Sequence, residues 1–307
     1  MTYVIIEHNN GKIEDISFEM LGKAKAMGNG VTAILLGSGT GDMVAQLGAA
    51  DKVIVCDDPA FANFNPEAAC KTASSILSGN TGDVILVGNT SMGMEIGPGL
   101  SASLGIPLVA YVTDIADGTV TSSLYGGKMS VQSAVSGGYI ASVMAGAFPG
   151  DDGRVDGSPA TEAATACVTS DLKVRFKQLI APEGGDVDIT QQDVLVSVGR
   201  GIQNEDNLEI VEELAQKLNA AVSCSRPIVD NKWLPKSRQV GKSGLKVKPK
   251  VYLAIGISGA PEHIEGMRDA DTIIAINTDE NAPIFDYADY GTTEDLFDVV
   301  PAITEKL

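Results

Sequence analysis

The sequence has 307 residues, and its 22 lysines and arginines stand against 40 aspartates and glutamates, giving a formal net charge of −18. This length predicts about two domains of roughly 150 residues each. A content of 44% hydrophobic and 20% charged residues is typical of a globular chain and excludes a disordered one. The acidic balance argues against nucleic acid or an anionic membrane surface as a general partner, because like charges repel.

Membrane insertion and secretion are not expected either. No apolar run reaches the ~20 residues that a membrane-spanning helix needs, and the first residues, MTYVIIEHNNGK, have neither a secretory nor an arginine-rich targeting character. The four cysteines are Cys56, Cys70, Cys167 and Cys224. Because they form no CxxC pair, we expect no disulfide and a protein of the reducing cytoplasm.

The first half of the chain alternates short apolar runs with helical stretches rich in small residues. Strands are expected at residues 3–7, 31–36, 52–55, 83–87 and 107–112, and helices at 18–26, 42–47 and 65–77. Asn65 and Pro66 are suited to the N-cap and first position of the last of these helices. Such alternation predicts a parallel sheet with helices on both faces.

The segments after residue 112 differ in character. Extended stretches separated by glycine, aspartate and proline turns are expected at residues 119–125, 128–135, 139–148 and 163–175. We interpret them as a mainly antiparallel appendage to the first sheet.

A second α/β domain follows the segment 182–188, PEGGDVD, which has the composition of a linker. The domains are therefore expected to be residues 1–184 and 185–307. In the second, strands are expected at 194–198, 221–224, 251–257 and 272–276, and helices at 207–218, 262–267 and 295–307. The predicted fold class is α/β, with two domains that are each built on a mainly parallel sheet with flanking helices.

Polar and glycine-rich turns follow four predicted strands of the second domain. They are Gly199-Arg200-Gly201, Ser225-Arg226-Pro227, Ser258-Gly259-Ala260 and Asn277-Thr278-Asp279. Ligands of parallel sheets bind beyond the carboxyl ends of the strands, so these turns predict one ligand site. The first turn starts like a dinucleotide fingerprint but lacks its third glycine, and the glycines at 256 and 259 would let the backbone approach a phosphate.

Basic residues are concentrated beside this edge. Residues 226–250 hold eight lysines and arginines and one acid, a local charge of +7 that suits a polyanion such as a pyrophosphate. Arg226 and Arg238 neighbour the turns, so we expect both at the site. Gly241-Lys242-Ser243 lacks the spacing of an NTPase phosphate loop but can offer backbone donors and a hydroxyl. His263 is expected to donate a hydrogen bond to a bound cofactor, since no metal-ligand pattern surrounds it.

The C-terminal half resembles the electron transfer flavoprotein alpha subunit. The resemblance rests on Val251-Tyr-Leu-Ala-Ile-Gly-Ile-Ser-Gly-Ala-Pro-Glu-His263, on Ile274-Ala-Ile-Asn277, and on the shorter motifs Ser225-Arg226-Pro227, Trp233-Leu-Pro235, Arg238-Gln-Val-Gly241, Asp289-Tyr-Gly291 and Asp295-Leu-Phe297. It implies a heterodimer with a beta subunit, and one FAD held mainly by a Rossmann-like C-terminal domain.

The resemblance also implies which residues contact the cofactor. These are Arg200, Ser225, Arg226, Gln239, Val240, Gly241, Lys242, Ser243, Ser258, Gly259, Ala260, Glu262, His263, Asn277, Asp295 and Leu296. In the family, the arginine at the place of Arg226 lies over the flavin ring, the hydroxyl matching Ser243 lies near N5, and the histidine matching His263 bonds toward the pyrimidine carbonyl. A lysine at position 242 and a carboxylate at position 262 depart from the family pattern and would act on the flavin potential in opposite directions.

The implied function is that of an electron carrier rather than a substrate-transforming enzyme. Electrons would pass from dehydrogenases, such as acyl-CoA dehydrogenases of fatty acid oxidation, to an acceptor such as a quinone oxidoreductase. One alternative is an electron-bifurcating variant that uses NADH. Another is a nucleotide-binding module without redox function, and an NAD-dependent enzyme rests only on the incomplete glycine motif at residue 199.

Overall fold

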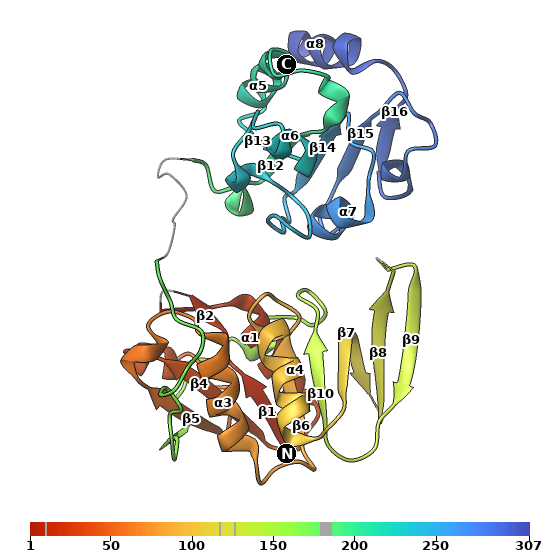
Figure 1. The fold of residues 1–307 in the computed structure, drawn as a ribbon. Helices are drawn as coiled ribbons and strands as arrows, with labels where there is room; N and C mark the ends of the chain where they lie inside the picture. The colour runs from red at the N-terminus through yellow and green to blue at the C-terminus, as the bar shows by residue number, and fades with distance from the viewer. Residues whose placement is uncertain (10, 117, 126, 179–185) are drawn as a thin grey trace. The chain divides into compact units, whose positions relative to one another are not determined.

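The computed structural model in Figure 1 describes residues 1–9, 11–116, 118–125, 127–178 and 186–307. The chain forms two compact units, Met1–Gln178 and Leu179–Leu307. The predicted boundary between residues 184 and 185 lies outside the described residues. Each unit is built on its own sheet with flanking helices, which confirms the predicted α/β class.

The first unit contains a nine-stranded sheet with the order β11-β5-β4-β1-β6-β10-β7-β8-β9. Its strands are β1 (Thr2–Ile5), β4 (Val31–Gly37), β5 (Lys52–Asp57), β6 (Val84–Gly88), β7 (Leu108–Ala116), β8 (Thr119–Leu124), β9 (Met129–Ala134), β10 (Tyr139–Val143) and β11 (Ala160–Ala163). Its α-helices are α1 (Asp15–Ala26), α2 (Gly41–Val44), α3 (Pro66–Leu77) and α4 (Gly93–Leu104). A separate hairpin consists of β2 (His8–Asn9) and β3 (Lys12–Ile13).

Helices cover both faces of the parallel part of this sheet, as expected. Successive residues of a strand point to opposite faces; Val4 packs in the layer that contains α1, whereas Tyr3 and Ile5 pack in the layer of α3 and α4. The α3 helix begins as predicted, because the Asn65 side chain accepts a hydrogen bond from the amide of Ala68 at 3.0 Å.

The antiparallel appendage is smaller than predicted. Within the described part of the nine-stranded sheet, the antiparallel pairs are β7 with β8 and β8 with β9, so the β8–β9 hairpin extends the sheet beyond β7 (Figure 1). The expected strand at 139–148 is β10, which pairs parallel with both β6 and β7, and β11 pairs parallel with β5. All five residues of β10 are buried. A strand with both faces covered belongs inside a parallel sheet, and its apolar run is too short to reveal its neighbours.

The expected absence of a disulfide is wrong. Cys56 in β5 and Cys167 beyond β11 form a disulfide with a Cα–Cα distance of 5.8 Å, although 111 residues separate them in the sequence. The parallel pairing of β11 with β5 carries the following chain past the end of β5 and brings the two cysteines together. The spacing of the cysteines along the sequence does not show that Cys56 and Cys167 lie close together. With this disulfide present, the cysteines no longer support the predicted reducing compartment.

The second unit has a five-stranded parallel sheet with the order β13-β12-β14-β15-β16. Its strands are β12 (Val194–Val198), β13 (Ala221–Cys224), β14 (Val251–Ile255), β15 (Ile273–Ile276) and β16 (Tyr290–Thr292). Its α-helices are α5 (Leu208–Lys217), α6 (Arg226–Asp230), α7 (Pro261–Met267) and α8 (Leu296–Lys306). The predicted strands and helices are all present, with β16 and α6 in addition.

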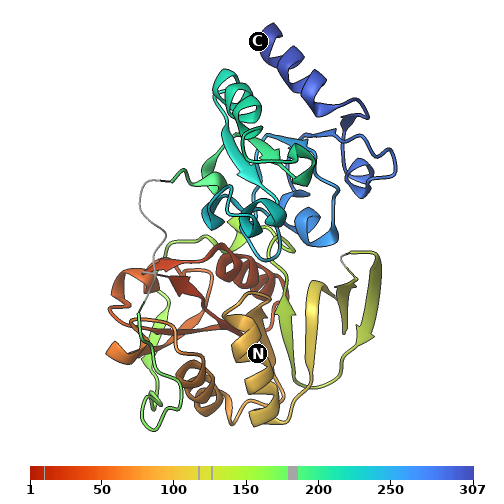
Figure 2. The ribbon, with the colours of Figure 1, turned by 45° about the horizontal axis from the view of Figure 1, so that its top comes forward.

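Two apolar layers cover the faces of this second sheet. One contains α5, α8 and the alternate strand residues Val196, Leu253 and Ile255, and in it α5 and α8 lie side by side (Figure 2). The other contains Tyr252, Ala254 and residues of α7. Within the described ranges, no helix combines the length and apolar character that crossing a bilayer demands.

A buried carboxyl group lies where β1 ends in the first unit. Glu7 is 2% exposed, its Oε2 accepts a hydrogen bond from Thr90 Oγ1 at 2.7 Å, and its Oε1 has no partner among the described residues. Gly93 packs so closely that a Cβ there would lie 2.9 Å from Oε1. Burial raises the pKa of Glu7 to about 7, and the bond from Thr90 opposes this rise.

The protonated Glu7 should therefore stabilise the protein in a defined pH range. The folded-state pKa lies above the ordinary value of 4.5, so this stabilisation is present below pH 4.5 and is lost as the pH rises through about 7. Across this pH range, the free energy of unfolding falls by up to about 3 kcal/mol. We predict that Glu7→Gln removes this loss, so that its melting temperature relative to wild type increases between pH 5 and pH 8. The exposed Glu95→Gln is the control, and parallel pH profiles for wild type and Glu7→Gln would contradict the assignment.

Candidate cofactor site

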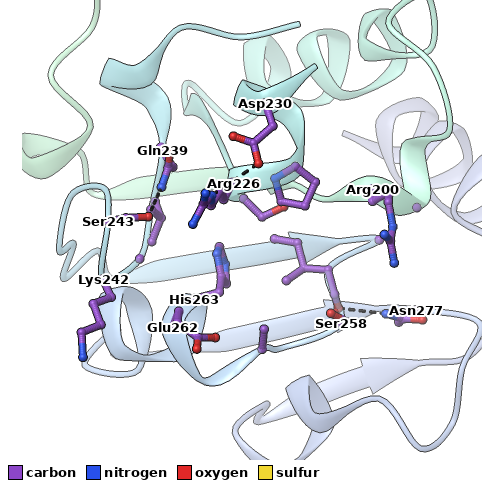
Figure 3. A pocket seen from close by; sticks show the side chains of 18 residues that line it. Arg200, Arg226, Asp230, Gln239, Lys242, Ser243, Ser258, Glu262, His263 and Asn277 are labelled. Carbon is purple, nitrogen blue, oxygen red and sulfur yellow. Dashed lines mark hydrogen bonds and ion pairs between the residues drawn. The ribbon is translucent and has the colours of Figure 1, made fainter. Parts of the chain in front are cut away.

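A cavity of about 830 Å³ lies at the carboxyl ends of the strands in the second unit (Figure 3), within the range of small-molecule and cofactor sites. It is lined by Arg200, Gly201, Ser225, Arg226, Pro227, Asp230, Gln239, Val240, Gly241, Lys242, Ser243, Gly256, Ile257, Ser258, Ala260, Glu262, His263 and Asn277. The strand order explains its position. From β12 the chain proceeds to β13 on one side and later returns to β14 on the other, so the loops diverge at this point.

Glycines allow the ends of β12 and β14 to approach each other. The amide of Gly201 donates to the Gly256 carbonyl at 3.0 Å, and Gly199 donates to Ile255 at 2.8 Å. A Cβ on Gly256 would lie 2.8 Å from the Gly201 Cα, and the Gly256 φ of +63° is rare for other residues. These turns therefore form a tight wall beside Arg200.

The loop that follows Arg238 is fixed to the start of α7. Lys242 donates its amide hydrogen to the Glu262 carbonyl at 2.7 Å, and a Cβ on Gly241, whose φ is +131°, would lie 2.7 Å from the same oxygen. The buried Gln239 donates from Nε2 to Ser243 Oγ at 2.9 Å. The Ser243 hydroxyl is thus held at the cavity by the loop itself.

Charged side chains surround the opening. Arg226 begins α6, and its Nε lies 3.3 Å from Asp230 Oδ2 one helical turn later, while 69% of the arginine side chain is exposed. Arg200 lies at the end of β12, and Lys242 lies 4.0 Å from the Glu265 carboxylate. Three cations and two nearby acids, Asp230 and Glu262, line the cavity, so an anionic ligand would meet a modest positive field.

His263 is the most enclosed ionisable group of the cavity. Only 6% of it is exposed, its Nε2 lies 3.0 Å from Tyr252 Oη, and its Nδ1 has no hydrogen-bond partner in the part of the chain that the structure describes. Burial lowers its pKa to about 4, against a smaller opposing effect of the Val240 backbone. The imidazole is therefore neutral at pH 7 and retains hydrogen-bonding capacity.

Asn277 connects two ends of the sheet. Its Nδ2 donates to the Ile257 carbonyl at 2.8 Å and its Oδ1 accepts from the amide of Asp279 at 2.9 Å. In Figure 3 it lies beside Ser258 at the end of the cavity away from Lys242. Among the described residues, no cluster of histidines, cysteines and acids suits a metal ion.

Of the sixteen residues that the family resemblance implies as cofactor contacts, thirteen line this cavity. The exceptions are Gly259, Asp295 and Leu296. Gly259 forms a turn with φ of +83° against Ile284, Asp295 caps α8 by accepting from the Phe297 amide, and Leu296 is buried in the apolar layer of α8. Their contact with a cofactor remains a prediction.

The expected position of Arg238 at the site is not observed. Its Nε donates to Asp186 Oδ1 at 2.6 Å and its Nη1 to the Val222 carbonyl at 2.8 Å. The guanidinium therefore joins the start of the unit to β13 and is used in packing. Asp230 was missed, although its spacing of four residues from Arg226 on a helix could have identified it.

A parallel sheet with glycine turns and a cationic cavity at its strand-order reversal defines a protein that binds a nucleotide cofactor. Comparison with known families makes this specific. Residues 2–172 match the electron transfer flavoprotein domain, and residues 188–268 match the electron transfer flavoprotein FAD-binding domain.

Full-length relatives agree with these matches. The chain is 33% identical to an electron transfer flavoprotein subunit alpha from Syntrophomonas wolfei, covering 100% of this chain and 98% of the relative. It is 34% identical to one from Megasphaera elsdenii (99% and 95%), and 33% identical to the acryloyl-CoA reductase electron transfer subunit beta of Anaerotignum propionicum (99% and 95%).

The chain belongs to the electron transfer flavoprotein alpha-subunit family, and its function is electron transfer with FAD as the cofactor. The residues present suit this cofactor. The arginines that line the cavity offset negative charge, the Ser243 hydroxyl is held there by Gln239, and the buried Nδ1 of the neutral His263 has no hydrogen-bond partner among the described residues.

The glycine contact between β12 and β14 can be tested by substitution. Gly256→Ala places a Cβ against Gly201 and imposes an unfavourable φ, so it should cost about 2 kcal/mol or more of unfolding free energy. We predict a melting temperature lower by roughly 5 °C, measured by thermal unfolding. Gly79→Ala is the control, since its Cβ would meet nothing within 4 Å. Equal melting temperatures of the two variants would show that the contact can relax.

Proposed function

We propose that this chain forms a heterodimer with an electron transfer flavoprotein beta subunit and holds one FAD in the cavity beside Arg226 and His263. The observation that carries the proposal is the coincidence of two independent results. The match to the FAD-binding domain covers residues 188–268, and all the cavity residues except Asn277 fall in that range. The printed names of the relatives as alpha subunits support a beta partner.

Each group of the cavity has a distinct part in holding the cofactor. The bound FAD supplies reversible acceptance of electrons. Arg226 and Arg200 supply positive charge, Ser243 supplies a hydroxyl held by Gln239, and His263 supplies a nitrogen with no other partner among the described residues. The turns at Gly199–Gly201 and at Gly256 fix the wall of the cavity, because their amides are bonded to neighbouring strand ends.

The arginines also act on the redox potential. A flavin ring gains negative charge on reduction, and a fixed guanidinium nearby stabilises that charge more than it stabilises the neutral oxidised ring. Glu262 at the same cavity acts in the opposite direction. The redox potential of the flavin therefore depends on the balance between the arginine charges and the Glu262 charge. Both act more strongly when the bound cofactor excludes water from the cavity.

The donors and acceptors follow from the chemistry of carriers of this kind. We propose that dehydrogenases such as acyl-CoA dehydrogenases reduce the carrier, and that a quinone oxidoreductase accepts its electrons, as in fatty acid oxidation. The Anaerotignum propionicum relative, named as an electron transfer subunit of acryloyl-CoA reductase, supports a partner that acts on acyl-CoA compounds. We propose these roles without an NADH-dependent bifurcating reaction, which no feature of the cavity specifically favours.

The presence of the cofactor can be tested directly. We predict that this chain, co-expressed with the beta subunit encoded in the same genome, purifies as a yellow heterodimer. Its absorbance spectrum should show flavin bands, and the flavin extracted from it should be FAD. A colourless heterodimer that fails to take up added FAD would contradict the proposal.

The charge of Arg226 can be tested by its effect on the potential. We predict that Arg226→Ala in the FAD-loaded heterodimer lowers the midpoint potential of the first one-electron reduction by roughly 30–60 mV, which corresponds to a loss of about 3- to 10-fold in the stability of the reduced form. The measurement is a spectroelectrochemical titration. Arg268→Ala is the matched control, because that arginine is not among the residues lining the cavity. Equal potentials for the two variants would place the Arg226 guanidinium away from the flavin.

A further inference from the structure

Arg238 joins separate parts of the second unit, although it is not among the residues that line the cavity. Its Nε donates to Asp186 Oδ1 at 2.6 Å, and its Nη2 pairs with the same carboxylate. Its Nη1 donates to the Val222 carbonyl of β13 at 2.8 Å, and the Ser237 hydroxyl donates to the other oxygen of Asp186. One guanidinium therefore holds the start of the described part of this unit against the edge strand of its sheet.

This ion pair is shielded from water, unlike a pair on the surface of the same unit. Only 19% of the Arg238 side chain and 21% of the Asp186 side chain are exposed, whereas the Lys250–Asp193 pair is 69% and 72% exposed. Exposed pairs contribute little to stability because water screens them, while a shielded arginine with two donors on one carboxylate is stronger and fixed in orientation. The hydrogen bond from Arg238 is the main cause that lowers the pKa of Asp186 to about 2, so this carboxylate is charged at neutral pH.

The cofactor loop, residues 239–243, begins directly after Arg238, and all five of its residues line the cavity. Its first residue, Gln239, is buried and donates from Nε2 to Ser243 Oγ at 2.9 Å (Figure 3). The side chain of Gln239 therefore sets the place of the Ser243 hydroxyl. Because Gln239 follows Arg238 in the chain, a displacement of Arg238 would move Gln239 and, with it, this hydroxyl.

The same end of the cofactor loop is attached to β13. Val240 donates its amide hydrogen to the Cys224 carbonyl at 2.9 Å, and Arg238 donates from its side chain to Val222, two residues earlier on the same strand. The guanidinium thus continues the pairing that the backbone forms between Cys224 and Gln239. Removal of the guanidinium would leave this end of the loop with its backbone pairing to β13 but without the bonds to Asp186 and Val222.

We propose that Arg238 and Asp186 are positioning residues that hold the cofactor loop, and with it the Ser243 hydroxyl, in the geometry that binds FAD. The identity of the ligand rests on the proposed function, whereas the order of the loop is a property of this chain. Arg238 therefore acts on the cofactor site through the residue that follows it rather than by contact with the ligand. The planar guanidinium suits this role, because it bonds the carboxylate and the strand carbonyl at the same time.

The order of the loop can be measured whether or not FAD is bound. Arg238→Met keeps a long side chain but removes every donor, so we expect amide hydrogen exchange in residues 236–246 to become about 10-fold faster. The measurement is hydrogen-exchange mass spectrometry of the heterodimer, with and without added FAD. Lys250→Met is the matched control, since it makes the same change in an exposed pair away from the cavity. Equal exchange of this segment in wild type and Arg238→Met would overturn the proposal.

The affinity for FAD separates positioning from general loss of stability. We expect Arg238→Met to weaken FAD binding by about 3- to 10-fold, measured by titration of the deflavinated heterodimer with FAD. Val300→Ala is the control for stability, because it opens space in the buried layer under α8 and should lower the melting temperature without changing FAD affinity. The proposal is wrong if Val300→Ala, at an equal fall in melting temperature, loses as much FAD affinity as Arg238→Met.

A double-variant cycle tests whether the two residues act together. Asp186→Asn keeps the shape of the side chain and removes its charge, while Arg238 keeps its bond to Val222, so we expect a smaller loss of FAD affinity than in Arg238→Met. The double variant should bind FAD as well as Arg238→Met alone, because the pair is already broken there. Losses that add in full would show that the two residues act separately.

These outcomes differ from those that would refute the proposed function. A heterodimer that takes up no FAD would refute the proposed function, while hydrogen exchange of the same protein would still decide whether Arg238 orders the loop. A FAD-loaded heterodimer in which Arg238→Met changes neither exchange nor affinity would refute only the positioning roles of Arg238 and Asp186.

Discussion

The close contact between the ends of β12 and β14 is the constraint on which the cofactor site depends. Gly201 donates to the Gly256 carbonyl, and both positions lack the Cβ that would separate the strands. Because the strand order reverses between these two strands, the following loops turn in opposite directions and leave a cavity between them. Arg200 lies within one glycine turn, between Gly199 and Gly201, and the helix that carries His263 follows the other turn. Separation of the two turns would displace both side chains.

The charge of the cavity is much smaller than the charge of its sequence neighbourhood. Of the basic segment 226–250, Arg226 and Lys242 line the cavity, whereas Lys246 and Lys250 pair with acids on the surface at 2.8 and 2.9 Å. Arg238 is used in packing against Asp186. Pairing with nearby carboxylates neutralises most of the positive charge of this segment, so little of that charge acts on a ligand in the cavity. An otherwise acidic protein can thus present a cationic opening without attracting polyanions over a whole surface.

Much of the second unit could be predicted from sequence, because its strands are continuous apolar runs that end in polar turns; β12 and β13 begin and end where the pattern places them. What could not be predicted depends on contacts between distant segments. The place of β10 between β6 and β7 is set by burial on both faces, and the Cys56–Cys167 disulfide is set by the pairing of β11. In the sequence pattern, Tyr252 is indistinguishable from the other apolar residues of its strand. The hydrogen bond between the Tyr252 and Ser197 hydroxyls joins residues that are 55 positions apart along the chain, so the sequence does not reveal it.

The two units use the ends of their parallel strands differently. In the first, the amides of Gly39 and Thr40 and the Thr40 hydroxyl all donate to the Asp57 carboxylate at 2.8 to 2.9 Å, and these bonds lower the pKa of Asp57. The protein's own carboxylate therefore takes the place that an anionic ligand would take in a glycine turn of this kind. In the second unit, His263 Nδ1 has no such internal partner among the described residues, and the arginines border an open cavity. A carboxylate of the protein thus fills the turn of the first unit, whereas the end of the sheet in the second unit borders a cavity. This difference accounts for a FAD-binding domain in the second unit even though both units place glycine turns at the ends of parallel strands.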